Sequence, residues 1–394
     1  MAVNPIFIDL ANFLIPAAIF ATMALALNLQ WGHTGLFNGG VAAFWAIGAY
    51  TTAILLTGPA PPSPQYPGHL GGYSQHFVVA ALVAMLLSGL VGLLIAFPLL
   101  RLRTDYFAIA TLALAEIVRI VLMNAQSLTA GTIGIILIPR PFDSFTVPDP
   151  GLSDLSMAAT AGIVLVMAFI GIGYMTRAPW GRVLRGIRED EEATLALGKN
   201  VFWFRLQAFV IGSAIMGLGG AVYAPYIRFI SPGQFDPLVT FTIYVMVILG
   251  GSGNNLGVVF GAFLFYAFDW ISVRAKDFFP TATIGDALVF PAGPILAAIA
   301  TALVAWFYLR TLRPPSTRWV PAGVLGLLFW GPVMVAQLAA AGVLSVPAFD
   351  IPLQEKIPAL RMMIIGGLLV ALVVYRPEGL LREHKRTYAP VTEP

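Results

Sequence analysis

Two ionisable side chains lie well inside an apolar run. Glu116 and Arg119, in the stretch TDYFAIATLALAEIVRIVLMN, are three residues apart and therefore share one face of a helix. A charged side chain at the centre of a membrane-spanning helix costs about 2.5–3.5 kcal/mol on insertion scales, so such residues often mark a functional site. Because this pair can also neutralise itself, two interpretations stay open: contact with a translocated solute, or a polar lock between helices.

Glycine-rich stretches provide the next candidates. Asn38 stands in WGHTGLFNGGVAAFWAIGAY, where the glycines let helix backbones pack closely or leave carbonyl groups free beside a cavity. Packing is the simpler interpretation, and a path-lining role for Asn38 is the alternative. Gly253, Gly257 and Gly261 recur every four residues, which predicts a small-residue face that packs within this chain or against a second membrane subunit.

Residues 176–205 form the only long charged run, with six basic residues and four consecutive acidic ones, Glu189, Asp190, Glu191 and Glu192. Inside this run, Val183, Leu184, Ile187, Ala193, Ala196 and Leu197 recur at helical spacing, and Gly198 follows where a helix would end. This pattern predicts one short amphipathic helix. Such a helix, tethered at both ends to apolar segments, is suited to docking into a groove of a soluble partner, and an ordinary charged loop is the alternative.

The elements that must position these residues are membrane-spanning helices. Of the 394 residues, 58% are hydrophobic and 10% are charged, whereas soluble domains carry about 25% charged residues. A span needs about 20 apolar residues. Candidate spans lie near 7–28, 36–57, 77–100, 106–124, 156–175, 206–226, 239–250, 256–274, 290–310, 320–345 and 360–375. We therefore predict an all-α polytopic membrane protein with about 11 transmembrane helices in a single domain, 1–394. The short 239–250 segment is expected to be broken or re-entrant.

Lysine and arginine positions predict the orientation of these spans. If the N-terminus lies outside, 15 of the 22 basic residues fall on inner segments, six fall on outer segments, and Arg119 lies within a span. This bias predicts a cytoplasmic C-terminus and places 176–205 in the cytoplasm. No lysine or arginine precedes Arg101, so the first apolar segment lacks the basic start of a secretory signal and is expected to belong to the mature fold.

Several kinds of chemistry are excluded by composition. The chain has no cysteine, and no two of its four histidines lie at metal-ligand spacing, so we predict no disulfide, metal or cofactor. It lacks the G-x-x-x-x-G-K-[ST] phosphate loop and the H-E-x-x-H and G-x-S-x-G motifs. We therefore predict no enzyme activity in this chain. Its net charge of +3 does not indicate nucleic-acid binding, because the basic residues are concentrated in a few loops.

Within the charged run, Glu192, Ala193 and Thr194, followed after three residues by Gly198, resemble the E-A-A-x-x-x-G coupling motif of bacterial ABC-importer permeases, with Thr194 replacing the second alanine. The longer strings GRVLRGIREDEEATLALGKN, RLRTDYFAIATLALAEIVR and VILGGSGNNLGVVFGA are similar to the LivM-type permeases of branched-chain amino-acid importers. His33, Asn38 and Gly40 depart from the family string. Residues 277–358 form an extra stretch that carries two predicted spans, an inserted helix pair.

This resemblance implies a permease in the cytoplasmic membrane of a bacterium or archaeon. It implies four kinds of partner: a second, LivH-type permease, two cytoplasmic ATP-binding subunits that hydrolyse the ATP, an extracytoplasmic solute-binding protein, and the lipid bilayer. It also implies that the 185–198 helix contacts one ATPase, through Arg185, Arg188, Glu191, Glu192, Ala193 and Gly198.

Three alternatives remain at this point. Permeases of the same superfamily could carry urea, short amides or other amino acids, because the binding protein largely sets specificity. A secondary transporter would work without ATPase partners and usually holds unpaired ionisable groups at the membrane midplane, where this chain offers only Glu116 and Arg119. An intramembrane enzyme is disfavoured by the missing catalytic motifs.

Overall fold

The computed structural model describes residues 5–58, 61, 63, 66–142, 150–278 and 381. The chain divides into two compact units, residues 1–268 with 368–394, and residues 269–367. All contacts described below lie within the first unit. The predicted spans 290–310, 320–345 and 360–375, and the predicted helix pair at 277–358 apart from its first two residues, lie outside the described residues.

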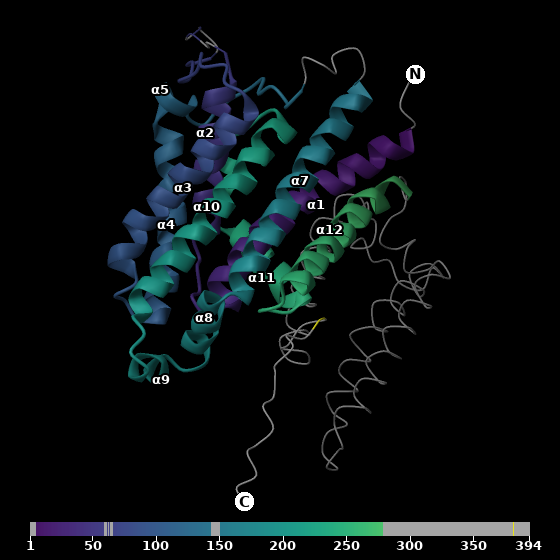
Figure 1. The fold of residues 1–394 in the computed structure, drawn as a ribbon. Coiled ribbons are helices and arrows are strands. Elements are labelled where there is room, and N and C mark those ends of the chain that lie inside the picture. Colours follow the sequence, from purple (N-terminus) through teal and green to yellow (C-terminus); the bar gives the residue numbers. More distant parts are fainter. Residues whose placement is uncertain are drawn as a thin grey trace, which may run out of the picture. The chain divides into compact units, whose positions relative to one another are not determined.

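Long apolar helices dominate the described part of the chain (Figure 1). Five of its helices are long and apolar enough to cross a membrane: α1 (Pro5–Leu27), α3 (Phe77–Leu99), α4 (Thr104–Asn124), α7 (Pro150–Arg177) and α10 (Val201–Ile227). Their side chains are predominantly apolar, as expected of helices that are surrounded by hydrocarbon or by other apolar helices. The prediction of an all-helical membrane protein is confirmed for these residues.

The centre of the fold is formed by α1 and α10. Helix α1 packs against α7, α10 and α11 (Leu238–Gly250), while α10 also packs against α2 (Val41–Leu56) and α3. Large side chains such as Met23, Phe44 and Phe209 are fully buried between these helices. Helix α4 lies further out and contacts α2.

The span predicted at 36–57 is not a continuous helix. Helix α1 continues into a π-helical turn, Asn28–Gly32, and residues 33–40 are not helical, so α2 begins only at Val41 and has 16 residues. Gly35 adopts a φ of +78°, a backbone conformation that side-chain-bearing residues rarely adopt. Irregular backbone at membrane depth is tolerated where protein surrounds it, and residues 28–40 are buried or nearly so.

A second interruption follows α10. The chain passes through a short 3-10 turn, Pro232–Phe235, into α11 and then into α12 (Asn255–Phe278), and the last two helices meet at an angle of 120°. The prediction that the 239–250 segment is broken or re-entrant is confirmed. The described residues therefore contain five spans by length and composition, or up to six if this bent pair is one span. The total of 11 stays a prediction.

Glycines permit the sharp bend between α11 and α12. A Cβ on Gly257 would clash with the carbonyl oxygen of Gly250, and one on Gly261 would clash with that of Met246. The expected stripe of three helical glycines needs a correction, because Gly253 lies in the turn before α12. Its φ is +85° and its N–H donates to Asn28 Oδ1 at 2.8 Å. The turn needs a residue of positive φ there, which a glycine inside a helix would not adopt.

Candidate coupling site and intramembrane polar clusters

The charged run folds into two helices, whereas the sequence predicted one. Helix α8 (Pro179–Glu189) ends at Asp190, and α9 (Glu191–Ala196) begins directly after it. Asp190 is extended, and its Oδ1 accepts a hydrogen bond from the N–H of Ala193 at 2.9 Å. Aspartate is a favoured N-cap because its side chain satisfies a backbone donor that a helix start leaves free. This cap explains why the predicted helix breaks.

Helix α8 is held against the membrane helices. Leu184 and Ile187 are 0% and 2% exposed. Arg185 donates to the carbonyl oxygen of Thr176 at 3.4 Å, and Arg188 donates to the carbonyl oxygen of Gly32. Within this chain, the two arginines therefore contact the end of α7 and the π-helical turn that follows α1. Their predicted contact with an ATPase stays a prediction. We call α8 the strut.

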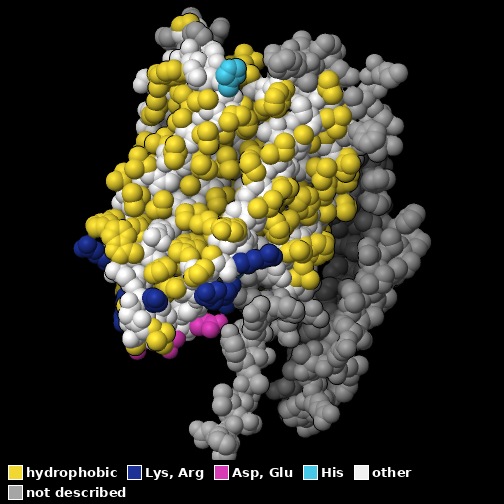
Figure 2. Space-filling model, in the orientation of Figure 1, with side chains coloured by type: hydrophobic (Ala, Val, Ile, Leu, Met, Phe, Trp, Pro, Cys, Tyr) yellow, Lys and Arg dark blue, Asp and Glu magenta, His cyan; other side chains and the backbone are white. Residues whose placement is uncertain are grey.

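Helix α9 is exposed. Glu192, Ala193 and Gly198 all face solvent, and the apolar side chains of Leu195 and Leu197 are 51% and 79% exposed. Figure 2 shows basic and acidic side chains gathered at the end of the molecule that carries α8 and α9, below a largely hydrophobic surface. An exposed apolar pair among charges is the pattern expected of a docking helix.

The motif glycine closes the exposed turn. Gly198 has a φ of +73°, and its N–H donates to the carbonyl oxygen of Leu195 at 2.9 Å. Glu191 is anchored by Arg205, with the ion pair at 2.8 Å. Among residues 191–200, only Thr194 is buried, and its hydroxyl donates to the carbonyl oxygen of Asp190 at 2.8 Å. The buried Thr194 hydroxyl thus stabilises the turn, while Glu192, Ala193 and Gly198 are exposed to solvent.

A polar junction lies beneath the strut, where α1, α7 and α12 end or begin. We define it by four side chains, Asn28, His33, Thr176 and Asn255, together with the Gly32 carbonyl to which Arg188 of the strut donates. Asn255 Oδ1 accepts from Asn28 Nδ2 at 2.9 Å and lies 3.1 Å from His33 Nε2, while its Nδ2 donates to Thr176 Oγ1 at 3.4 Å. The junction therefore joins the strut to three membrane helices. The sequence signal that could have indicated it is the presence of amides at the ends of apolar runs.

Asn38 belongs to a separate, buried hydrogen-bond network. Its Nδ2 donates to Gln30 Oε1 at 2.8 Å, and its Oδ1 accepts from the N–H of Gly40 at 2.8 Å. Gln30 in turn donates to the carbonyl oxygen of Phe209 at 2.8 Å, and the hydroxyl of Tyr244 donates to the carbonyl oxygen of Asn38 at 3.1 Å. Asn38 is 0% exposed, so its side chain supports the interrupted span between α1 and α2.

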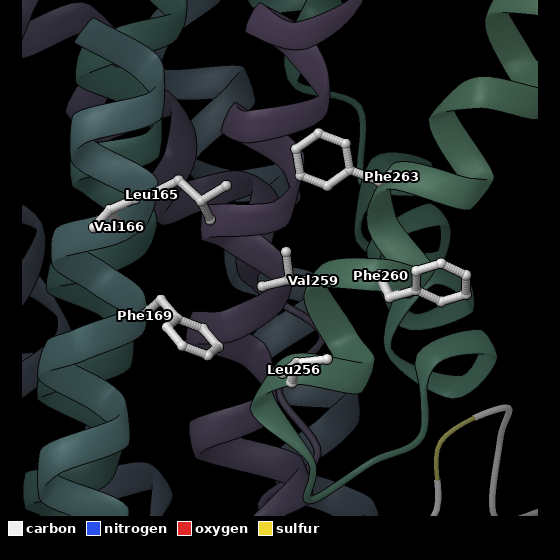
Figure 3. Close-up of a pocket in the computed structure, with 7 residues that line it drawn as sticks. All are labelled: Leu165, Val166, Phe169, Leu256, Val259, Phe260 and Phe263. Carbon is white, nitrogen blue, oxygen red and sulfur yellow. The ribbon is translucent and has the colours of Figure 1, made fainter. Parts of the chain in front are cut away.

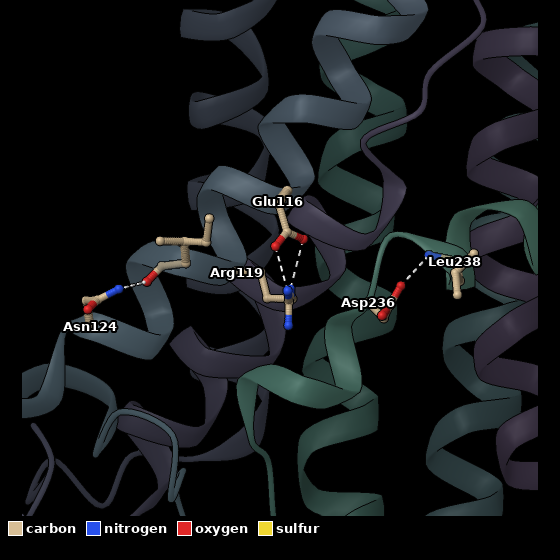
Figure 4. A network of polar contacts seen from close by, with 6 residues as sticks. Glu116, Arg119, Asn124, Asp236 and Leu238 are labelled. Atoms are coloured by element: carbon tan, nitrogen blue, oxygen red, sulfur yellow. Dashed lines mark hydrogen bonds and ion pairs between the residues drawn. The ribbon is translucent and has the colours of Figure 1, made fainter.

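Glu116 and Arg119 form the ion pair that their spacing predicted (Figure 4). Glu116 Oε2 accepts from Arg119 Nε at 2.9 Å, and Oε1 accepts from Nη2 at 2.5 Å. The side chains are 38% and 26% exposed, respectively. The pair is thus partly exposed on the surface of α4, and both of its hydrogen bonds lie within that helix.

One apolar groove lies between α7 and α12, with a volume of about 420 Å³ (Figure 3). Its walls carry no polar side chain and are formed by Leu165, Val166, Phe169, Leu256, Val259, Phe260 and Phe263. The groove suits hydrocarbon and offers no partner for a charged group. Within the described ranges, no cluster of His, Asp and Glu could hold a metal ion.

Comparison with known proteins identifies the family. The profile described as "Branched-chain amino acid transport system / permease component" matches residues 10–283, which is more than half of the chain. The chain belongs to this family. It is a multi-pass protein of the cytoplasmic membrane, and the resemblance found in the coupling-motif strings is confirmed.

Individual relatives agree with this assignment. The chain is 33% identical over 266 residues to the high-affinity branched-chain amino acid transport system permease protein LivM of Escherichia coli (strain K12), covering 62% of this chain and 59% of that protein. It is 28% identical over 270 residues to a probable branched-chain amino acid transport permease protein LivM of Methanocaldococcus jannaschii, covering 62% and 75%. The guanosine ABC transporter permease protein NupQ of Bacillus subtilis is 25% identical over 237 residues, covering 55% and 68%.

The matched part of the chain spans about three fifths, 59%, of the length of the enterobacterial LivM proteins. The family profile covers the strut, α9, the polar junction and the ion pair, and it ends at residue 283. No solved structure matches the chain.

Proposed function

We propose that this chain is the permease subunit of a binding-protein-dependent ABC importer. The observation that carries the proposal is α9, an exposed turn with the family's coupling motif at Glu192, Ala193 and Gly198, mounted on a strut bonded to the membrane helices. A turn held in this way can be displaced by a soluble partner and can transmit that displacement to the membrane-spanning helices. The permease family supports this role.

The proposed partners follow from the importer scheme. Two cytoplasmic ATP-binding subunits hydrolyse ATP, and this chain contributes no catalysis or cofactor. One of them receives α9 through Glu191, Glu192, Ala193 and Gly198, while Arg185 and Arg188 transmit its motion from within the strut. A LivH-type permease completes the membrane domain, and an extracytoplasmic binding protein delivers the solute.

We propose the following orientation. The N-terminus lies outside, and the end that carries α8 and α9 lies in the cytoplasm, as the excess of basic residues on that side suggests. The C-terminus is also cytoplasmic, all residues form one transmembrane domain, and 277–358 adds a helix pair to it.

Branched-chain amino acids are the proposed solutes, because the LivM relatives are named for them. Other solutes are the second candidate, because further relatives are named for guanosine and for autoinducer 2. Uptake of radiolabelled leucine, with unlabelled valine, urea and guanosine as competitors, distinguishes these solutes.

The coupling role is tested by Glu192→Lys and Gly198→Pro. Glu192→Lys reverses a charge on the exposed turn, and proline can neither adopt a φ of +73° nor donate the hydrogen bond to Leu195. We expect normal membrane insertion and a loss of leucine uptake in both variants. Arg182→Glu, an exposed charge reversal on α8 outside the motif, is the control and should keep uptake. Full uptake by both motif variants would refute the coupling role.

A further inference from the structure

The ion pair of α4 lies at membrane depth. Glu116 is 12 residues after the start of α4, about 18 Å along its axis, and Arg119 is five residues before its end, about 7.5 Å, at 1.5 Å per residue. The hydrocarbon core is about 30 Å thick, so both side chains fall within the length over which α4, as a candidate span, would cross it.

This pair is exposed where a purely structural pair would be covered. Glu116 and Arg119 are 38% and 26% exposed on the surface of the chain. Facing hydrocarbon, they would lose their remaining hydration without gaining further partners, and that loss can exceed the attraction within the pair. This face of α4 must therefore meet water or another polar surface.

A third charge, Asp236, makes the cluster unbalanced. It belongs to the link between the turn Pro232–Phe235 and α11, and it attracts Arg119 electrostatically. In Figure 4, dashed lines join Glu116 to Arg119 and Asp236 to Leu238, and Asp236 lies to one side of the ion pair. One Asp236 oxygen accepts from the N–H of Leu238 at 2.8 Å. Two carboxylates against one guanidinium leave a net charge of −1, which a lock between helices would not need.

The wall next to Asp236 is aromatic and contains unpaired donors. Phe235 packs against Trp45 and Tyr50, with ring centroids 4.7 Å and 5.7 Å apart. Trp45 and Tyr50 are 2% and 3% exposed, yet Trp45 Nε1 and the Tyr50 hydroxyl have no hydrogen-bond partner among the described residues. Native proteins rarely leave buried donors unpaired, so a buried water molecule is expected beside these two groups, close to Asp236.

We propose that the face formed by Glu116, Arg119 and Asp236 lines a water-filled solute path and contacts the charged head group of a zwitterionic solute. Arg119 pairs with the solute carboxylate, and Asp236 pairs with its ammonium group. The inference rests on the proposed importer function and assigns the solute class to one face of the permease. The α7–α12 groove cannot serve this role because its walls are apolar, and Asn38 cannot because it is fully buried.

Single-cysteine labelling tests the position of the path, because the natural chain has no cysteine. Leu112 and Met123 continue the helical row of Glu116 and Arg119, whereas Ile117 and Val121 lie on the opposite exposed flank of α4. Each is changed to cysteine in the complete complex, reconstituted in vesicles. The probe is a membrane-impermeant, positively charged methanethiosulfonate, which reacts with the thiolate and therefore only where water reaches the thiol.

We expect labelling of Leu112→Cys and Met123→Cys at least about tenfold faster than labelling of Ile117→Cys and Val121→Cys. Excess leucine should slow the fast reactions. Equal rates on both flanks would overturn the path, and protection by urea but not by leucine would overturn the head-group assignment. Leucine uptake by the unmodified complex is measured in the same vesicles. If the unmodified complex does not take up leucine, the proposed importer function is contradicted. If it takes up leucine but the cysteines on the two flanks of α4 are labelled at equal rates, only the proposed position of the path is contradicted.

Charge variants test the head-group contact. Asp236→Asn removes the charge but keeps an oxygen that can cap Leu238, so the fold of α11 should persist. We expect its maximal uptake rate at saturating leucine to fall about tenfold while the ATPase subunits still copurify. The double variant Glu116→Arg, Arg119→Glu keeps an ion pair at the same spacing. Full uptake by both variants would assign the cluster a structural role and overturn the contact.

Discussion

Arg188 connects the proposed docking region with the interior of the membrane domain. Its guanidinium donates to the carbonyl oxygen of Gly32, the last residue of the π-helical turn that ends α1. Its backbone and side chain also lie against Gly35, where a Cβ would come within 3.5 Å of Arg188 Cγ. π-Helical turns often mark functional sites. This single side chain therefore connects α8 to the interrupted span, and we propose that it transmits a displacement of α8.

Arg188→Ala should uncouple the complex. The variant leaves the Gly32 carbonyl without its charged donor, so motion of the strut is no longer transmitted to α1. We expect leucine uptake by reconstituted complexes to fall at least about tenfold, while ATP hydrolysis persists and no longer depends on the loaded binding protein. A hydrogen bond to a charged group contributes about 1.5–3 kcal/mol, which is consistent with that loss.

The control for this prediction is Arg182→Ala, an exposed arginine on the same helix. Arg188→Lys keeps the charge and should recover part of the coupling. If Arg188→Ala shows the same ratio of solute to ATP as the natural chain, the link through Gly32 is not used.

At the scale of elements, the separation of α8 from α9 divides the coupling region into two parts. The strut buries Leu184 and Ile187 and is hydrogen-bonded to helix ends, whereas Leu195 in α9 and Leu197 directly after it are exposed. The break at Asp190 allows these two orientations, because a continuous helix would keep one apolar face on one side throughout. A rigid strut with an exposed turn transmits displacement better than a loop would.

The bend between α11 and α12 predicts a position-specific effect of adding one methyl group. Gly257→Ala places a Cβ against the carbonyl oxygen of Gly250, so the two helices must separate. We expect a loss of about 1–3 kcal/mol of stability from this overpacking. The measurement is the apparent thermal midpoint of the detergent-solubilised complex.

Gly171→Ala is the matched control for this variant. A Cβ at Gly171 in α7 meets nothing within 4 Å, and alanine favours a helix over glycine by about 0.5–1 kcal/mol. Its thermal midpoint should stay the same or rise. Equal midpoints for the two variants would show that the α11–α12 contact is dispensable.

For the whole molecule, orientation follows from where the charges gather. We predict that Leu197→Cys, at a residue 79% exposed directly after α9, reacts with an impermeant maleimide only in inverted membrane vesicles. Tyr73→Cys, at a residue 47% exposed in the loop between α2 and α3, should react only in intact cells. The natural lack of cysteine removes background labelling. Labelling of both from the same side would contradict the proposed topology.

The composition of the complex is the second prediction at this scale. Purification of the tagged chain should recover a second permease and two ATP-binding subunits, identified by mass spectrometry. Their copurification should weaken in Glu192→Lys, because α9 is their proposed contact. Recovery of this chain alone, active in uptake when reconstituted without ATP, would replace the importer with a secondary transporter.

Much of the site was predictable because its signals are local. Glu116 and Arg119 are three residues apart, so helix geometry alone brings them together. The coupling motif is contiguous, and its exposure follows from its charge. The polar junction was not predicted, because Asn28 and Asn255 meet across a sequence separation of 227 residues.

The sequence by itself determined that this is a helical membrane protein and where its long helices begin and end to within several residues, and it predicts that 176–205 lies in water. The free energy of transferring a contiguous apolar or charged segment from water to lipid is roughly the sum of the contributions of its residues. It can therefore be evaluated without knowing the fold. Only the tertiary structure decided that the chain unwinds at 33–40, that Asp190 divides the coupling region, and that Arg188 turns inward to Gly32. These outcomes depend on hydrogen bonds whose partners are distant in sequence, and folding alone brings those partners together.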